Sequence, residues 1–329
     1  MILKKIDLDA ALALIARSGQ LYVPGEVLGV SRFVGWGGET LFDYSNTVMP
    51  PKDILFPNTQ VMYNYTTGVH ASIEEVTQDT KQTVFGIRPC DMRGVECMDK
   101  VFLEKSYTDS FYSRKRESTT FIALACTAPA ATCFCDSMGI DPAAAPAADV
   151  LLREQKDSYE VTAQTDKGRE VIKLWGELLH ESSENSKSSA AACTLKVKMN
   201  KDIPEKLSKM SEHTIWDSAG RACIGCATCT YACPTCYCFD MSSDTHGSEG
   251  TAFRCWDSCM FSDYTRMAGG HNPRPTKKER VRNRYMHKLS YFHQRYGMVL
   301  CTGCGRCLEK CPQGLDITEF IDNVAEVSL

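Results

Sequence analysis

Eight cysteines in two copies of one spacing carry the clearest chemical signal in this sequence of 329 residues. Each copy reads C-x2-C-x2-C-x3-C and is followed by proline, which is the run that binds a [4Fe-4S] cluster. In such paired runs the fourth cysteine usually ligates the cluster of the other run. We therefore predict two clusters with crossed ligands, Cys223, Cys226, Cys229 and Cys311 for one, and Cys301, Cys304, Cys307 and Cys233 for the other. Zinc or disulfide bonds are the alternative, but zinc ligands usually come as two separated pairs.

Two further cysteines come directly after apolar segments of strand length. Cys90 follows residues 83–87 (TVFGI), and Cys126 follows residues 120–125 (TFIALA). Neither segment alternates polar and apolar residues, which indicates strands buried on both faces of a parallel sheet. If these strands are neighbours, their carboxyl ends lie together, where open α/β sheets place their ligand sites. We therefore expect the two thiols to lie side by side.

A short loop, CFC, brings two more thiols, Cys133 and Cys135, within reach of the same point. Because four converging thiols suffice for another [4Fe-4S] cluster, we predict a third cluster bound by Cys90, Cys126, Cys133 and Cys135. The alternative is that these side chains are small buried hydrophobic groups, a common fate of free cysteine. Cys97 lies inside an expected helix and Cys193 beside an expected linker, so we interpret both as plain thiols.

The segment between the two cysteine runs has its own chemistry. Four irregularly spaced cysteines there suit either a further metal site or thiols packed beside the clusters: Cys236, Cys238, Cys255 and Cys259. Residues 274–295 are strongly basic, which fits nucleic-acid contact or a solvated helix face. A better fit is that guanidinium groups offset the negative charge of thiolate-ligated clusters and raise their reduction potential. We also expect a docking surface for a partner at Arg280, Arg282 and Arg284.

Composition limits the class of protein. The net charge is -4 and the apolar content is 43%, which argue against a disordered chain and against a nucleic-acid-binding protein. No apolar stretch is long enough to cross a bilayer, and the amphipathic N-terminus lacks the features of a secretory signal. Eighteen cysteines without such a signal indicate a reducing compartment and metal ligation rather than disulfides. We expect a cytoplasmic protein from an anaerobic setting, with no membrane span.

The elements that must position these cysteines form a mixed fold, α/β followed by α+β. We predict an α/β domain at 1–180, a linker at 181–199, and a two-cluster ferredoxin-like domain at 200–329 with a large insertion at 234–300. Because the insertion is long, it must have structure of its own. In the first domain we expect a helix near 6–18, strands within 20–45, a hairpin around 155–158 and a helix near 168–180.

Taken together, the motifs resemble a known family across residues 80–320. The matching segments are GIRPCDMRGVECMDKVF, CFCDSMG, CPTCYCFD, RCWDSC, MAGGHNPR, ERVRNRYMHKLSYF and CTGCGRCLEKCPQGLDI. They resemble the iron-sulfur β subunit of soluble cytoplasmic hydrogenases, and equally the A subunit of anaerobic sulfite reductase and related subunits of flavin-linked heterodisulfide reductase complexes. The resemblance also matches the four thiols of the predicted third cluster to cysteine positions of the family.

In that family the subunit relays electrons between a flavin- and nicotinamide-binding partner and a separate catalytic subunit. The resemblance therefore implies an electron-transfer subunit without an active site of its own. It places FAD or FMN and NAD(P) on a flavoprotein partner, and hydrogenase, sulfite reductase or heterodisulfide reductase chemistry on another subunit. The flavin would split hydride pairs into single electrons. One alternative is a catalytic sulfur- or heterodisulfide-reducing subunit that uses a cluster of the insertion cysteines, and another is an iron-sulfur regulator that binds nucleic acid.

Overall fold

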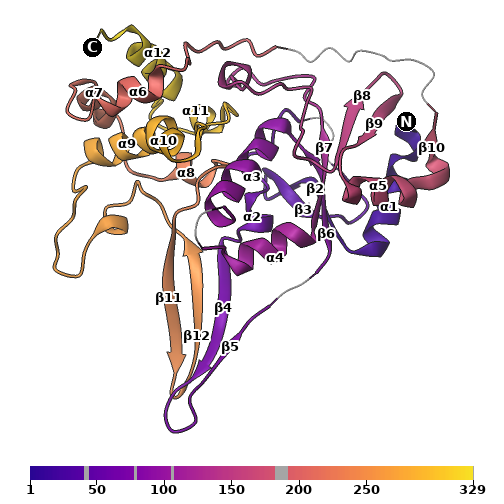
Figure 1. The fold of residues 1–329 in the computed structure, drawn as a ribbon, viewed down its shortest axis with the longest axis horizontal. Helices are drawn as coiled ribbons and strands as arrows, with labels where there is room; N and C mark the ends of the chain where they lie inside the picture. Colours follow the sequence, from indigo (N-terminus) through magenta and orange to yellow (C-terminus); the bar gives the residue numbers. More distant parts are fainter. Residues whose placement is uncertain (41–43, 78–79, 105–106, 182–191, 329) are drawn as a thin grey trace.

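A computed structural model describes residues 1–40, 44–77, 80–104, 107–181 and 192–328 of the chain. Its first part is built on one large sheet, whose strands are β1 (Ile2–Lys4), β2 (Gln20–Val27), β3 (Val30–Gly35), β6 (Gln82–Ile87), β7 (Thr119–Leu124), β8 (Val150–Glu154), β9 (Ser158–Ala163) and β10 (Leu179–His180). The eight strands lie in the order β10-β1-β9-β8-β7-β6-β2-β3 (Figure 1). The four inner strands β8, β7, β6 and β2 are parallel, whereas the outer pairs are antiparallel.

Helices cover both faces of this sheet. One face packs on α1 (Leu8–Ser18) and α5 (Asp166–Trp175), and the other packs on α2 (Lys52–Leu55), α3 (Pro89–Phe102) and α4 (Ser110–Ser118). Val84 and Phe121 therefore belong to the core beneath α3, while their neighbours Phe85 and Ile122 belong to the core beneath α1. This arrangement confirms that β6 and β7 are parallel neighbours buried on both faces, as their unbroken apolar sequences predict.

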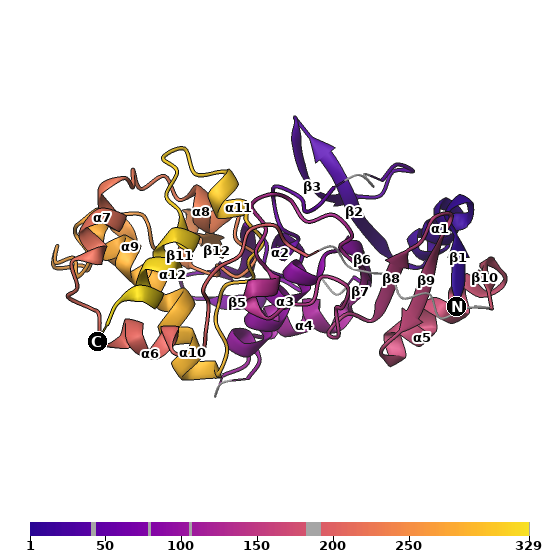
Figure 2. The same cartoon turned by 90° about the horizontal axis from the view of Figure 1, so that it is seen from above.

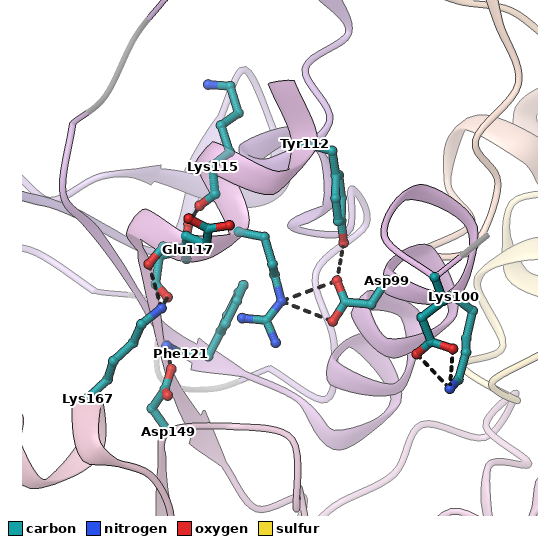
Figure 3. A network of polar contacts seen from close by, with 11 residues as sticks. Asp99, Lys100, Tyr112, Lys115, Glu117, Phe121, Asp149 and Lys167 are labelled. Carbon is teal, nitrogen blue, oxygen red and sulfur yellow. Dashed lines mark hydrogen bonds and ion pairs between the residues drawn. The ribbon is translucent and has the colours of Figure 1, made fainter. Parts of the chain in front are cut away.

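A polar network fixes α4 and α5 near the start of β7 (Figure 3). The Tyr112 hydroxyl donates to Asp99 Oδ1 at 2.7 Å, which joins α4 to α3. The Phe121 N–H donates to Asp149 Oδ2 at 2.8 Å, and Lys167 of α5 donates to two backbone carbonyls between α4 and β7. These contacts lie at the amino end of the strands, whereas Cys90 and Cys126 follow β6 and β7 at the opposite, carboxyl end.

The local predictions for this part agree with the structure apart from their bounds. The first helix is α1, the expected strands are β2 and β3, and the expected hairpin is β8–β9. The later helix starts earlier than predicted and stops at Trp175, because Gly176 takes a positive φ of 42° and the chain then turns into β10. Residues 182–191 of the predicted linker lie outside the described residues.

A second sheet joins two segments that are far apart in the sequence. It consists of β4 (Thr59–Thr66), β5 (Ser72–Glu75), β11 (Phe239–His246) and β12 (Glu249–Trp256), in the antiparallel order β11-β12-β4-β5. Figure 1 shows it projecting away from the rest of the molecule. At its base the buried Arg254 donates to Asp109 at 2.6 Å and to Gln60 at 2.8 and 3.0 Å. The insertion therefore has structure, but it shares that structure with the N-terminal part.

The C-terminal lobe is helical (Figure 2). Its helices are α6 (Ile203–Ser208), α7 (Ile215–Arg221), α8 (Thr228–Tyr231), α9 (Lys277–Met286), α10 (Phe292–Tyr296), α11 (Arg306–Glu309) and α12 (Ile317–Glu326). A π-helical turn, His287–Tyr291, joins α9 to α10. The rings of Trp216, Tyr285 and Phe320 pack at the centre of the lobe, with centroids 4.9 and 4.7 Å apart. No helix among the described residues is long and apolar enough to cross a membrane.

A buried ion pair fastens this lobe to the α/β part. Arg306 of α11 donates two hydrogen bonds to the Asp91 carboxylate of α3, at 2.5 and 2.8 Å, and both side chains are 1% exposed. The same guanidinium also donates to the Thr47 carbonyl. Since Arg306 lies between two cysteines of the second run, this contact places that run against the end of the sheet where Cys90 lies.

Candidate iron-sulfur sites

A cavity in the C-terminal lobe is lined by three cysteines of the first run and the last two cysteines of the second: Cys223, Cys226, Cys229, Cys307 and Cys311. Gly225 and Ala227 take positive φ values of 75° and 64°, which lets the short loop wrap around one point before α8 begins. The backbone N–H of Gly225 donates to Cys223 Sγ at 3.3 Å, and that of Leu315 donates to Cys311 Sγ at 3.2 Å. This geometry supports the crossed assignment, because Cys311 and not Cys233 completes the set.

Arg284 shows that this cavity suits an anionic group. The side chain is 4% exposed and lines the cavity, and one Nη donates to the Cys229 carbonyl at 3.3 Å. Its Nε has no hydrogen-bond partner among the described residues, and neither has the buried hydroxyl of Tyr285. A buried donor without an acceptor costs about 1–3 kcal/mol. A thiolate-ligated cluster in the cavity would supply the missing acceptors and offset the charge of Arg284.

The second predicted ligand set also lies together. The thiol of Cys233 interacts electrostatically with each of the other three, Cys301, Cys304 and Cys307. Burial is the main cause that raises the pKa of Cys301 to about 11 and that of Cys307 to about 12. Cys233 differs, because a hydrogen bond from the Cys236 thiol lowers its pKa, against burial and with help from Lys288. Cys301 and Cys307 would therefore need a bound metal group to stay deprotonated at neutral pH.

Lys288 supplies a positive charge at this second set. It lies in the π-helical turn, is 3% exposed, and its Nζ lies 3.1 Å from Cys233 Sγ and 3.0 Å from Thr235 Oγ1. Among the described residues it forms no ion pair with a carboxylate. An unpaired buried ammonium is strongly unfavourable, so Cys233, whose sulfur lies 3.1 Å away, is its counter-ion within this set. Lys52, also 3% exposed, adds a second cation, with its Nζ 3.0 Å from the Cys236 carbonyl oxygen.

The prediction that the basic stretch forms a docking surface is wrong for two of its three arginines. Arg280 and Arg284 are buried, at 7% and 4% exposure, and Arg282 is engaged with the Ser211 carbonyl and Glu212. The α9 helix therefore turns two of its five cations inward, Arg280 towards backbone carbonyls and Arg284 towards the cysteines of the first cavity. The interpretation of these cations as charge compensation for clusters is the one that the packing supports.

The structure brings the four thiols predicted for a third cluster into one region, together with Cys193 and Cys304. Cys126, Cys133 and Cys135 interact with one another electrostatically, and the Cys135 sulfur also lies 3.6 Å from that of Cys193. Cys90 lies in the first turn of α3, where it interacts with Cys304 and Cys135 and is flanked by the Asp91–Arg306 ion pair. Sequence reasoning missed Cys193, because no local spacing links it to the other thiols.

The insertion cysteines are divided between two places. Cys236 is hydrogen-bonded to Cys233, while Cys238 is hydrogen-bonded to Cys259. Cys255 lies on β12, opposite Asp240. Across the described ranges no three His, Cys, Asp or Glu side chains are arranged to hold a single metal ion. A tetrahedral zinc ion with bonds of about 2.3 Å would hold its thiolates ~3.8 Å apart, a spacing tighter than that of the ligands of a cubane cluster.

Comparison with known proteins identifies the same cysteine-rich region. The family model of the 4Fe-4S dicluster domain matches residues 222–315, which include both cysteine runs and the insertion. The chain is 31% identical over 318 residues to sulfhydrogenase 2 subunit beta of Pyrococcus furiosus, and the match covers 94% of this chain and 93% of that protein. No solved structure matches the chain significantly.

Proposed function

Since the chain belongs to the iron-sulfur β-subunit family that includes sulfhydrogenase 2 subunit beta, we propose that it is the electron-transfer subunit of an oxidoreductase complex. It passes single electrons between a flavoprotein that reacts with NAD(P) and a separate catalytic subunit. The catalytic partner is of the hydrogenase type, because the relative is named as a sulfhydrogenase. Sulfite reductase and heterodisulfide reductase partners have no comparable support.

The observation that carries this proposal is a continuous row of thiol sets. The wall of the first cavity contains Cys307, a member of the second set. The backbone carbonyl of Cys304, in that second set, accepts a hydrogen bond from the Cys133 thiol at 3.7 Å. A third set of thiols therefore lies directly beside the second. When bound, [4Fe-4S] clusters in these sets provide one-electron carriers at short intervals. The chain itself holds the thiols, keeps water out and supplies buried cations.

The row reaches the surface at its first end. Cys226 is the exposed thiol of the first cavity, and the neighbouring Ile224 is 52% exposed. At the other end, Asn46 and Arg88 line an open cleft, and Asn46 Nδ2 lies 3.8 Å from Cys133 Sγ. Two separate approaches suit a subunit that accepts electrons from one partner and delivers them to another.

The test is to add electron donors to the iron-loaded chain under anaerobic conditions and to follow its visible absorbance. Dithionite should bleach the chain, whereas NADH or NADPH should leave it unchanged until the flavoprotein subunit of the same complex is added. Flavins convert a hydride into single electrons, and the proposal places that cofactor on the partner. Rapid bleaching of the isolated chain by NADH or NADPH would refute the relay.

One observation favours a second candidate, a catalytic subunit that reduces disulfides or sulfur compounds. Cys238 and Cys259 form a hydrogen-bonded thiol pair beside Tyr264, and this pair lies against the core of the C-terminal lobe. Paired thiols can reduce a substrate disulfide by thiolate attack and then form a disulfide themselves, which needs two electrons to be reset. Turnover of a disulfide by the isolated chain with dithionite as donor, abolished in Cys238→Ser, would favour this candidate over the relay.

A further inference from the structure

Four thiols from three separate segments converge beside the second cysteine run. Cys133, Cys135 and Cys193 are 5%, 7% and 2% exposed, and Cys126 is partly buried. Every pair among the four interacts electrostatically. The Cys135 and Cys193 sulfurs are 3.6 Å apart, which is closer than the ligands of a cubane cluster, so one of these two side chains turns aside when the cluster binds. We propose that these four thiols, Cys126, Cys133, Cys135 and Cys193, ligate a third [4Fe-4S] cluster. The assignment rests on the electron-relay function proposed above, but it replaces Cys90 with Cys193.

The segment that carries Cys193 is fixed to the loop that carries the other thiols. Asp136 Oδ2 accepts the Cys193 N–H at 3.1 Å and also pairs with the Lys196 ammonium. One residue further along the loop, Ser137 Oγ accepts the Val197 N–H at 3.1 Å. These contacts hold the backbone at Cys193 against the Cys133–Cys135 loop. The Cys193 N–H and the residues that follow it therefore fix this thiol next to the loop.

Charged and polar donors face these thiols as they face the other two sets. Burial raises the pKa of the Cys126 thiol, and the Arg88 guanidinium opposes this rise. Arg88 is 6% exposed, and its Nε has no hydrogen-bond partner among the described residues. Asn46 Nδ2 lies 3.8 Å from Cys133 Sγ on another side. An unpaired buried guanidinium nitrogen and an amide N–H beside four thiols fit an anionic cluster better than neutral thiols.

Cys90 touches both the second and the third set and is tied to the second by its neighbour. Its thiol interacts with Cys304 and Arg306 of the second set and with Cys135 of the third, and it packs in the same buried cluster as the thiols of both. The adjacent Asp91 is committed to the buried ion pair with Arg306, which fixes the first turn of α3. Cys90 therefore lies between the two sets, where its uncharged thiol fills the space that separates them.

Close backbone packing joins the third set to the second. The Phe134 N–H donates to the Gly303 carbonyl at 2.8 Å. A Cβ at Gly303 would lie 2.6 Å from the Cys135 backbone, and one at Gly305 would lie 2.5 Å from the Thr132 carbonyl oxygen. The glycines of the second run thus allow the loop of the third set to lie directly on it, which keeps the path for an electron short.

The test uses the full chain, reconstituted anaerobically with iron and sulfide, and counts iron per chain. At four irons per cluster, the wild type should hold about 12 irons and Cys193→Ala about 8, a loss of one third. Cys90→Ala should keep the full complement, as should the matched control Cys97→Ala, whose thiol is also buried in α3. Loss of the third cluster in Cys90→Ala but not in Cys193→Ala would overturn the assignment.

A second measurement needs no substitution and covers the case in which Cys193→Ala does not fold. Oxidative removal of the iron from the wild type should leave Cys193 in a disulfide with another thiol of its set, most simply Cys135, as read by peptide mass. A disulfide that contains Cys90 instead would contradict the proposal. So would about 8 irons in the wild type with Cys135–Cys193 already oxidised, which would identify a simple disulfide. The iron count is independent of the flavoprotein test, so the two proposals can fail separately.

Discussion

Replacement of Lys288 by methionine is the sharpest test of how the chain sets the potential of its second cluster. The ammonium lies 3.1 Å from Cys233 Sγ, is 3% exposed and forms no ion pair with a carboxylate in the described part of the chain. An added electron spreads over the cluster, so we take ~5 Å as its mean distance from the charge, at an effective dielectric constant of about 20. The interaction is then ~3 kcal/mol, which corresponds to ~140 mV for a one-electron couple.

Because a positive charge stabilises the reduced cluster, Lys288→Met should lower the potential of one cluster by about 140 mV. An anaerobic redox titration followed by electron paramagnetic resonance measures the shift. Lys277→Met is the matched control, since that side chain is exposed on the same α9 helix system, and it should leave both potentials unchanged. A shift below about 30 mV, or a shift confined to the cluster of the Cys223 run, would refute the reasoning.

Three further predictions follow from the same contacts. Cys233→Ser should disturb the spectrum of the cluster bound by the Cys301 run; if only the cluster of its own run changes, the crossed ligation is wrong. Asp91→Asn should destabilise the chain by about 3–5 kcal/mol, because it leaves the buried Arg306 charge unpaired, and an unchanged thermal midpoint would contradict this. Burial lowers the pKa of His287 to about 4, so its contribution to stability should be lost as pH falls from about 6.5 to about 4. His287→Gln should flatten that part of the curve of thermal midpoint against pH, and an equally steep curve would assign the loss to other groups.

The sequence alone determined the features that depend on short-range geometry. Three thiols at intervals of three residues can surround one point only in a tight loop, so each cysteine run can be recognised from the sequence without knowledge of the fold. The strands β6 and β7 were equally predictable, because burial on both faces requires an unbroken apolar sequence. The placement of Cys126 just beyond a strand end followed from the same pattern. Crossed ligation remains a prediction that the cavity around Cys311 supports.

The tertiary structure decided everything that depends on which distant segments meet. Cys193 joins Cys135 only because Asp136 and Ser137 hold the segment that follows residues 182–191. The pairing of β4 with β12 likewise joins residues nearly 200 positions apart, for which neither strand carries a local signal. The sequence also did not reveal that the side chains of Arg284 and Lys288 point into the protein. Apolar periodicity identifies the buried face of a helix only when that face is apolar. Here the buried face carries cations, and only the thiols opposite them make that arrangement favourable.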